Sequence, residues 1–394
     1  MDRSYRVVVV GAGGIGAAAC YWAARAGVDV LGLEKFPLFH ARGESQDHSR
    51  IIRLAQHAEP YASLAPSAYD AWAEVESEAG MQLVVKTGGL VIEAVSERRN
   101  LDTGTRNITG YTEAFRAHGV DFELLDAAET RQRWPQFRFN GDEQVIYQRD
   151  SGLVDAARAN AVHVSLARAH GADIRAETPV RALHPTARGV EVVTDAETFL
   201  AERVITAAGA WTNEVLPAAA PRLPLLVTQE QVTYYSTPHL SEFSPTRFPV
   251  FMWHGRSNFY GFPVYGEVAT KLGQHLGGHP VTADTRDFVP DQERIDRQRR
   301  FIEEHIPDFL GPELYTKTCL YTIPPDQDFV VGPLPADPRI QVFVGAGHAF
   351  KFASLLGRIL VDLALVGTTT HPVDGLGLDR PALTNPAFVP TYHV

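Results

Sequence analysis

The sequence has few cysteines, fewer basic than acidic residues, and no long apolar run. Its 394 residues include only two cysteines, Cys20 and Cys319, which excludes a disulfide framework or a cysteine-rich zinc site, so we predict no metal site. Lysine and arginine number 36 against 47 acidic residues, a net charge of −11, which argues against a broad nucleic-acid-binding face. No segment approaches the roughly 18 apolar residues of a membrane span. We expect a cytoplasmic protein that binds neither nucleic acid nor membrane.

The composition is that of a globular protein. Apolar residues make up 45% and charged residues 21% of the chain, which is ordinary for a folded domain. At about 150 residues per domain, the length predicts two domains.

The first 35 residues carry the pattern of a βαβ unit. The valine-rich run 5–10 predicts a strand buried on both faces. Residues 11–16 (GAGGIG) follow directly and open an alanine-rich helix that ends near residue 27, and a second strand is predicted over 28–33.

The glycines and the acid of this unit predict dinucleotide binding. Gly11 permits the tight turn, Gly13 lets the backbone approach a pyrophosphate, and Gly16 lets the helix pack close to the sheet. The pyrophosphate would then lie at the helix N-terminus, which favours negative charge. Glu34 closes the second strand, and its carboxylate can accept ribose hydroxyls and would repel a 2′-phosphate.

The chain returns to this unit further along. Residues 204–210 and 340–344 read as buried strands, and a second glycine turn at 345–347 leads to an apolar helix pattern around 355–363. This return favours FAD over NAD, although an NAD-dependent dehydrogenase stays the alternative.

The remaining segments read as a different domain. Alternating apolar residues in 84–150 and 223–324 predict an antiparallel sheet. We predict an α/β fold with a bipartite Rossmann-like FAD-binding domain and an α+β substrate domain on a mixed or antiparallel sheet. The FAD-binding domain is predicted from residues 1–83, 151–222 and 325–394, and the substrate domain from 84–150 and 223–324.

Four separated motifs resemble one flavoprotein family. They are 43–53 (GESQDHSRIIR), 260–263 (YGFP) followed by 271–275 (KLGQH), 317–322 (KTCLYT) and 347–352 (GHAFKF). Together they resemble the monomeric sarcosine oxidase / N-methyltryptophan oxidase family, within the D-amino-acid-oxidase-like FAD-dependent oxidoreductases. The resemblance covers about residues 5–385. It implies a monomer that oxidises a secondary or N-methyl amino acid by hydride transfer to FAD, with O₂ as acceptor. The products would be an imine, then aldehyde and amine, and hydrogen peroxide.

The resemblance also implies roles for particular side chains. Arg53 and Lys351 correspond to the pair that binds the substrate carboxylate, with Tyr260 beside them. Lys271 corresponds to the lysine that activates oxygen, and the implied catalytic set is Lys271, Arg50, Tyr260 and His275. The implied cofactor-binding set is Gly11, Gly13, Gly16, Glu34, Lys35, Ser49, Arg50, Val180, Gly209, Cys319, Gly347 and Lys351.

Cys319 corresponds to the cysteine that forms a thioether with the 8α carbon of FAD in this family. The alternative is a buried apolar cysteine, which is the common fate of a free thiol. Cys20, in the alanine-rich helix, is expected only to pack.

Some residues leave alternatives open. Arg50 and Arg53, three apart, could instead form salt bridges on a surface helix, and we place His48 on a helix surface. Gln46 stands where many relatives have a histidine and could only form hydrogen bonds. Trp253 and His254 lie on the predicted substrate sheet, but the direction of their side chains does not follow from the pattern.

The substrate stays open as well. Sarcosine, N-methyltryptophan, a cyclic imino acid and a pathway-specific amine would all present the same anchor. A non-catalytic flavoprotein, in which FAD only stabilises the fold, is a further alternative.

Overall fold

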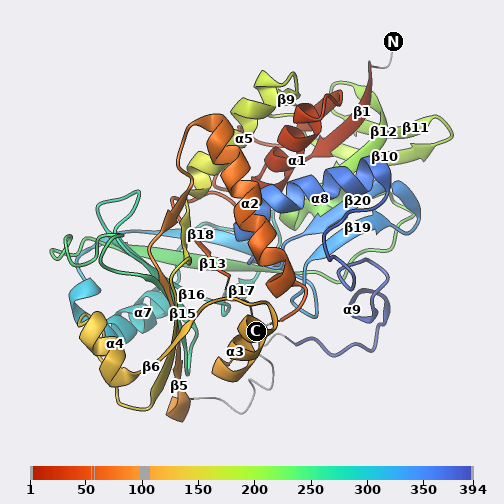
Figure 1. Cartoon of the computed structure of the whole chain (residues 1–394). Helices are drawn as coiled ribbons and strands as arrows, with labels where there is room; N and C mark the ends of the chain where they lie inside the picture. Colours follow the sequence, from red (N-terminus) through yellow and green to blue (C-terminus); the bar gives the residue numbers. More distant parts are fainter. Residues whose placement is uncertain (1–2, 55, 57, 98–106, 392–394) are drawn as a thin grey trace.

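The computed structural model describes residues 3–54, 56, 58–97 and 107–391 of the chain (Figure 1). Its first sheet comprises β1 (Arg3–Val10), β2 (Val30–Leu33), β9 (Asp173–Arg175), β10 (Val180–Thr186), β11 (Gly189–Thr194), β12 (Thr198–Thr206), β19 (Val330–Leu334) and β20 (Asp337–Val344). The parallel centre runs in the order β20, β12, β1, β2, β9, and the hairpin β10–β11 and strand β19 extend it with antiparallel pairs.

Strand β1 is buried on both faces, as its valine run predicts. Val7 and Val9 pack into one apolar core, whereas Val8 and Val10 pack into another on the opposite side. This division follows from the period of two along a strand. Strands β10 and β11 form a hairpin, and the buried strand expected at 340–344 lies within β20. The buried strand expected at 204–210 forms only as far as Thr206, where β12 ends, and Gly209–Trp211 is instead a short helix, η2.

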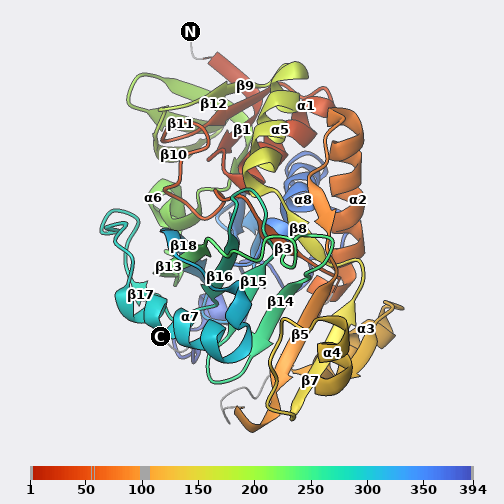
Figure 2. The same cartoon turned by 90° about the vertical axis from the view of Figure 1, so that its left-hand side faces the viewer.

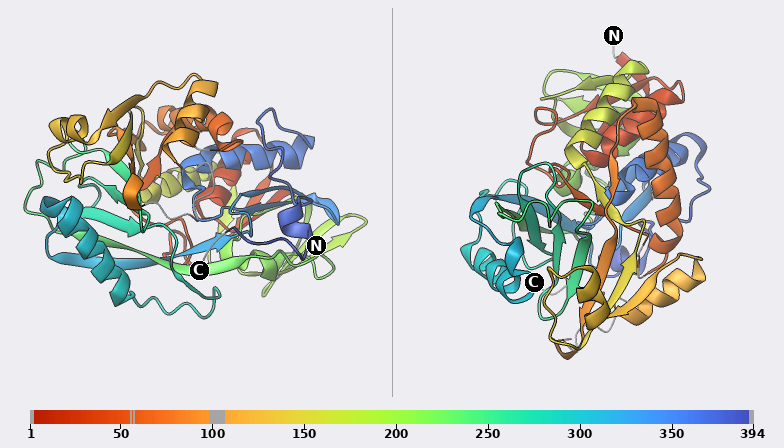
Figure 3. Two further views of the ribbon diagram at one scale, coloured as in Figure 1. Left: turned by 90° about the horizontal axis from the view of Figure 1, so that it is seen from below. Right: turned by 60° about the vertical axis from the view of Figure 1, so that its left-hand side comes forward.

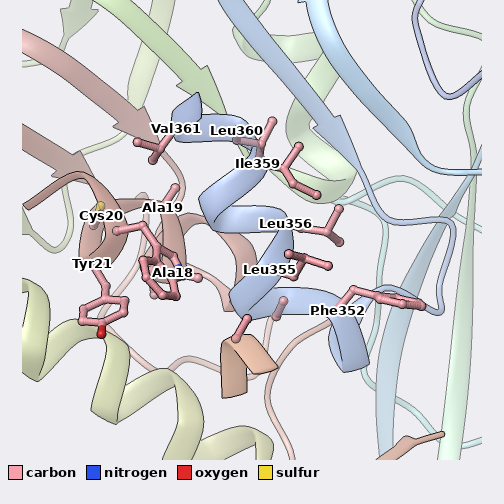
Figure 4. Packing of buried hydrophobic residues seen from close by; sticks show 14 of the residues in the cluster. Ala18, Ala19, Cys20, Tyr21, Phe352, Leu355, Leu356, Ile359, Leu360 and Val361 are labelled. Carbon is pink, nitrogen blue, oxygen red and sulfur yellow. The ribbon is translucent and has the colours of Figure 1, made fainter. Parts of the chain in front are cut away.

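Four helices cover one face of the first sheet: α1 (Gly14–Arg25), α2 (Tyr61–Ala79), α5 (Ala156–Ala169) and α8 (Ala353–Val366). The alanines of α1 allow α8 to approach closely, and a Cβ on Gly357 would lie 2.6 Å from the Cβ of Ala18. Figure 4 shows α8 beside α1, with Leu355, Leu356, Ile359 and Leu360 of α8 in the same apolar cluster as Ala18 and Ala19 of α1. Cys20 is fully buried in α1, so its predicted packing role is confirmed.

The second sheet comprises β5 (Gly89–Ala94), β6 (Glu123–Asp126), β7 (Glu143–Gln148), β13 (Leu226–Tyr235), β14 (Val250–His254), β15 (Phe259–Phe262), β16 (Thr270–Gln274), β17 (His279–Pro280) and β18 (Glu313–Ile323). It is mixed, because β5 and β14 are parallel and the other pairs are antiparallel. The long strands β13 and β18 pair along their length and run side by side in Figure 3 (left). The helices of this half are α3 (Ile108–Ala117), α4 (Ala127–Arg133) and α7 (Gln292–His305).

A small antiparallel sheet joins the two halves near the middle of Figure 2. It comprises β3 (Arg50–Ile52), β4 (Val84–Lys86) and β8 (Gly152–Val154). Arg50 therefore lies in a strand, and the alternative of a surface helix through Arg50 and Arg53 is wrong. His48 precedes this strand in a loop, so its expected place on a helix is wrong too. Pairing with β8 fixes the extended backbone that local sequence leaves open.

Short elements complete the chain: η1 (Val95–Glu97), η2 (Gly209–Trp211), α6 (Thr212–Val215), η3 (Pro307–Phe309), η4 (Phe350–Phe352) and α9 (Pro381–Thr384). Within residues 3–391, apart from the undescribed gaps, no helix is long and apolar enough to cross a membrane. The domain boundaries drawn from the sequence stay a prediction.

Candidate active site

A cavity of about 600 Å³ is lined by residues from both large sheets. Thirteen of the sixteen predicted catalytic, substrate-binding and cofactor-binding residues line it: Gly11, Gly13, Glu34, Lys35, Arg50, Arg53, Val180, Gly209, Tyr260, His275, Cys319, Gly347 and Lys351. Gly16, Ser49 and Lys271 lie outside this lining. The structure thus gathers segments from both ends of the chain around one space.

The glycine turn leaves no room for side chains. Gly11 has φ of +91°, and a Cβ there would lie 2.6 Å from the carbonyl oxygen of Ala207. A Cβ on Gly16 would lie 1.8 Å from the carbonyl oxygen of Gly11, so this glycine supports the turn rather than the cavity. Helix α1 begins at Gly14 beside the cavity, where the helix dipole favours an anionic group; the amide of Gly14 itself donates to the hydroxyl of Ser45 (2.9 Å).

Glu34 places a carboxylate in the cavity wall directly after β2; we call this position the Glu34 corner. Its carboxylate accepts hydrogen bonds from the amides of Ala12 (2.8 Å) and Phe36 (3.0 Å) and lies 3.1 Å from the His40 ring. Burial opposes ionisation, but His40 and the amides hold the pKa of Glu34 below its ordinary value. An ionised carboxylate at this place can accept ribose hydroxyls.

Positive side chains also line the cavity. Arg53 donates to the hydroxyl of Tyr111 (3.2 Å), a residue of α3. Lys351 lies in η4, its ammonium donates to the carbonyl of His348, and its own carbonyl accepts from Trp72 (2.9 Å). Helix α2, which carries Trp72, therefore fixes the backbone of Lys351. Such cations can hold a carboxylate through charge-assisted hydrogen bonds.

Lys271 lies one layer behind the cavity wall. It is 1% exposed, and its ammonium lies 2.5 Å from Asp47 and donates to the carbonyl (2.8 Å) and hydroxyl (3.2 Å) of Ser49. Burial lowers the pKa of Lys271 to about 8, and Asp47 opposes this shift. Burial likewise opposes ionisation of Asp47, but Lys271 and Arg50 hold the pKa of that carboxyl well below its ordinary value.

Cys319 lines the cavity from β18. Burial raises the pKa of its thiol to about 11, and nearby Arg50 opposes this rise, so the thiol is protonated at neutral pH. Arg286 fixes the neighbouring backbone, because it donates to the carbonyl of Thr318 (2.5 Å) and to that of Ala41 (3.2 Å). The loop after β2 is thereby tied to the strand that carries the cysteine.

Comparison with known proteins decides the family. Residues 6–363 match the family described as FAD dependent oxidoreductase. The chain belongs to this family. The resemblance drawn from the four motifs and the prediction of an FAD-dependent oxidoreductase acting on CH–NH bonds are thereby confirmed, and the alternatives of an NAD-dependent dehydrogenase and a non-catalytic flavoprotein lose their support.

Several relatives match over nearly their full length. A monomeric sarcosine oxidase of Streptomyces avermitilis is 32% identical over 382 residues, which are 95% of this chain and 97% of that one. An N-methyl-L-tryptophan oxidase of Yersinia pestis is 28% identical over 362 residues, 90% and 93% of the two chains. The solved open form of NikD, an unusual amino acid oxidase essential for nikkomycin biosynthesis, has a TM-score of 0.83 at 28% identity and covers 95% and 97%. The predicted fold class is confirmed.

The cavity fits the cofactor of this family. The turn at Gly11 and the start of α1 line the cavity, and the close approach of Gly11 to Ala207 allows no side chain at the turn, which suits a pyrophosphate. Glu34 suits the ribose, and Arg50, Cys319 and Lys351 line the same cavity, where they could contact the redox-active ring.

Sequence reasoning missed several residues of the cavity wall. Asp47, Tyr111 and Tyr321 line the cavity, and the burial of Glu44 raises its pKa to about 7. Asp47 has a signal in the sequence, an acid three residues before Arg50 in a segment rich in polar groups. Tyr111 has none, because only the tertiary packing of α3 brings it to Arg53.

The four residues left without a role lie in three different surroundings. Gln46 and His254 line the cavity, and the side-chain oxygen of Gln46 is buried without a hydrogen-bond partner within the described part of the chain. Trp253 is 1% exposed and packs in the apolar core of the second sheet. His48 lies 3.0 Å from Glu267.

Proposed function

We propose that the chain is an oxidase of secondary or N-methyl amino acids that binds the substrate carboxylate between Arg53 and Lys351. The observation that carries this proposal is the convergence of these two cations in one cavity with Cys319 and Glu34. The names of the relatives support it, because two of them denote oxidases of N-methyl amino acids.

The cations would serve the chemistry as well as the binding. When bound, FAD supplies the acceptor for a hydride from the carbon next to the substrate nitrogen. A positive wall lowers the pKa of a nearby amine, so Arg53 and Lys351 would favour the neutral amine that can lose this hydride. The resulting imine is hydrolysed to aldehyde and amine, and O₂ is reduced to hydrogen peroxide. Tyr260 and His275 would border the substrate.

Lys271 and Arg50 would act on the oxygen half of the reaction. Reduction of O₂ creates negative charge, and a fixed cation in a site that excludes water stabilises such charge strongly. Lys271 is buried and needs no reorganisation to supply it. The remaining predicted cofactor contacts, among them Lys35, Ser49, Val180, Gly209 and Gly347, belong to the same proposal.

We also propose the thioether between Cys319 and FAD. Its place in the cavity wall supports the bond. Forming the bond removes one hydrogen from the thiol and one from the 8α methyl group, and O₂ accepts both as hydrogen peroxide. Acid precipitation of the yellow holoprotein tests this: colour should stay in the pellet, and the peptide with Cys319 should carry the mass of FAD. A colourless pellet and a peptide of unmodified mass would refute the bond.

The monomeric state, the cytoplasmic location and the division into two domains also stay proposals. Light scattering of the holoprotein should give the mass of one chain, 43.3 kDa.

A panel of amines tests the activity. The purified holoprotein is mixed with sarcosine, N-methyl-L-tryptophan, proline and pipecolate, and hydrogen peroxide is measured. Release of peroxide with the N-methyl compounds supports the proposal. Release with the cyclic compounds alone would establish the alternative of a cyclic imino acid oxidase. A flavin that no amine bleaches would refute the proposal.

A further inference from the structure

One buried carboxylate in the cavity wall, that of Asp47, contacts three cations, of which only Lys271 lies outside the lining. One oxygen of Asp47 lies 2.5 Å from Lys271 and accepts from Arg50 (3.2 Å). The other oxygen accepts from the hydroxyl of Tyr234 (2.6 Å) and lies 3.6 Å from the ammonium of Lys317. The side chain of Asp47 is 3% exposed and that of Lys271 is 2% exposed, whereas that of Lys317 is 40% exposed.

The surroundings of Lys271 show what this carboxylate does. The Phe262 ring lies 4.5 Å from its ammonium and the Tyr234 ring 5.7 Å, while Ser49 supplies neutral acceptors. Arg50, a like charge, disfavours the ammonium form. Cys319 is a neutral thiol. Asp47 is therefore the ionised group that favours a charged Lys271 in this buried place.

We propose that Asp47 is a positioning residue that keeps Lys271 in its ammonium form and directs it, together with Arg50, toward the redox part of the cavity. The inference rests on the proposed function and deepens it, because it names the group on which the oxygen half of the reaction depends. The geometry also explains why the two oxygens of this carboxylate have different partners. One oxygen binds the two cations of the inner wall, and the other is held by Tyr234.

The test replaces Asp47 by Asn (D47N) and uses K271M and K317M as comparisons. K317M is the matched control, because it removes a half-exposed cation from the same carboxylate. The FAD of each holoprotein is reduced with dithionite, and its reoxidation by O₂ is followed by absorbance from pH 6 to pH 9. Chemical reduction makes the measurement independent of any amine. A failure of the proposed amine oxidation can therefore be told apart from a failure of the inference about Asp47.

We expect D47N to reoxidise about five-fold more slowly at pH 8 for a fall of one unit in the Lys271 pKa, because about half of the wild-type molecules but only about one variant molecule in ten would then carry the ammonium. The rate should recover as the pH falls, since acid restores the ammonium. K271M should be slow at every pH, K317M should stay near wild type, and the double variant D47N/K271M should be no slower than K271M. A D47N enzyme with the wild-type rate and pH profile would overturn the inference, as would one whose slow rate fails to recover in acid.

Two further readouts do not depend on turnover. If Lys271 loses its proton in D47N, one negative and one positive charge disappear together, so the flavin reduction potential should stay close to wild type. A clear rise in potential would show that Lys271 stays charged and would overturn the inference.

Thermal unfolding against pH gives the second readout and needs no bound cofactor. In the wild type the pKa of Lys271 is lower in the folded than in the unfolded chain, so stability gained from this group rises with pH above about 8. D47N should shift this rise to lower pH, and K271M should abolish it. An unshifted rise in D47N would count against the inference.

Discussion

Replacement of Lys351 by Met removes one of the two cations that we assign to the substrate carboxylate. Lys351 is 7% exposed in the cavity wall, so its contact with a carboxylate would be shielded from water. A hydrogen bond to a charged group contributes about 1.5–3 kcal/mol. Since 1.4 kcal/mol corresponds to a factor of ten, we expect binding of the carboxylated substrate to weaken by roughly 10- to 150-fold.

The assay measures this contact by comparing two substrates. Sarcosine carries the carboxylate, and dimethylamine is the same amine without it; for another substrate from the panel, its decarboxylated amine takes this place. The preference in kcat/KM for the carboxylated member should fall by the factor above in K351M. The pH optimum should also move upward, because a less positive cavity lets the amine keep its proton to higher pH.

The control is K35M. Lys35 lines the same cavity but lies 3.6 Å from Glu214, beside the Glu34 corner. Its removal should leave the ratio between the two substrates unchanged. Equal losses for both substrates in K351M, or an equal change of the ratio in K35M, would refute the assignment of the carboxylate to Lys351.

Three further substitutions test other parts of the site. Cys319→Ser should move the yellow colour from the acid pellet to the supernatant, whereas the control Cys20→Ala should leave it in the pellet. The colour is measured by absorbance, and a yellow pellet from C319S would show that the bond is formed by another residue. Burial raises the pKa of Glu44 to about 7, so the folded chain binds this proton more tightly, and stability from this group should fall as the pH rises from about 4.3 to 7. Thermal unfolding of the apoprotein should show no such fall in E44Q. The same dependence of stability on pH in E44Q and in the wild type would contradict this prediction. Gly347→Ala would put a Cβ 2.5 Å from the Tyr321 ring at a φ of +75°, so urea unfolding should show a loss of about 1–3 kcal/mol; Gly119→Ala, at a φ of +63° with no atom within 4 Å, is the control and should lose less.

The nucleotide half of the site could be predicted because its requirements are local. The turn at Gly11, the contact of Gly16 and the carboxylate at Glu34 all follow from a strand, a helix and a strand adjacent in sequence. At Gly11 and Gly16 the residue type is fixed by the backbone, because a Cβ at either position would clash with a carbonyl oxygen.

The Asp47 cluster could not be predicted in this way. It needs β3, β13, β16 and β18 to converge, and each strand supplies one polar residue that is unremarkable in its own segment. A buried ion pair has no periodic pattern in sequence, because its partners are set by the packing of separate strands.

The pair Trp253 and His254 shows an intermediate case. Alternation along β14 requires the two side chains to face opposite sides, and Trp253 is buried in the core while His254 lines the cavity. The alternation shows that the two side chains face opposite sides of the sheet, but it does not show which of them faces the core. That depends on the place of β14 between β5 and β15.

The packing of α8 on α1 has a consequence for biosynthesis. The alanine face of α1 stays uncovered until residues 353–366 have left the ribosome, and Lys351 emerges only just before them. The glycine turn is therefore translated among the first residues, but its helix gains the contact with α8 only near the end of translation. Because Gly345, Gly347 and Lys351 line the cavity, its wall is complete only after translation of almost the entire chain, and α1 has to wait during that interval for its contact with α8.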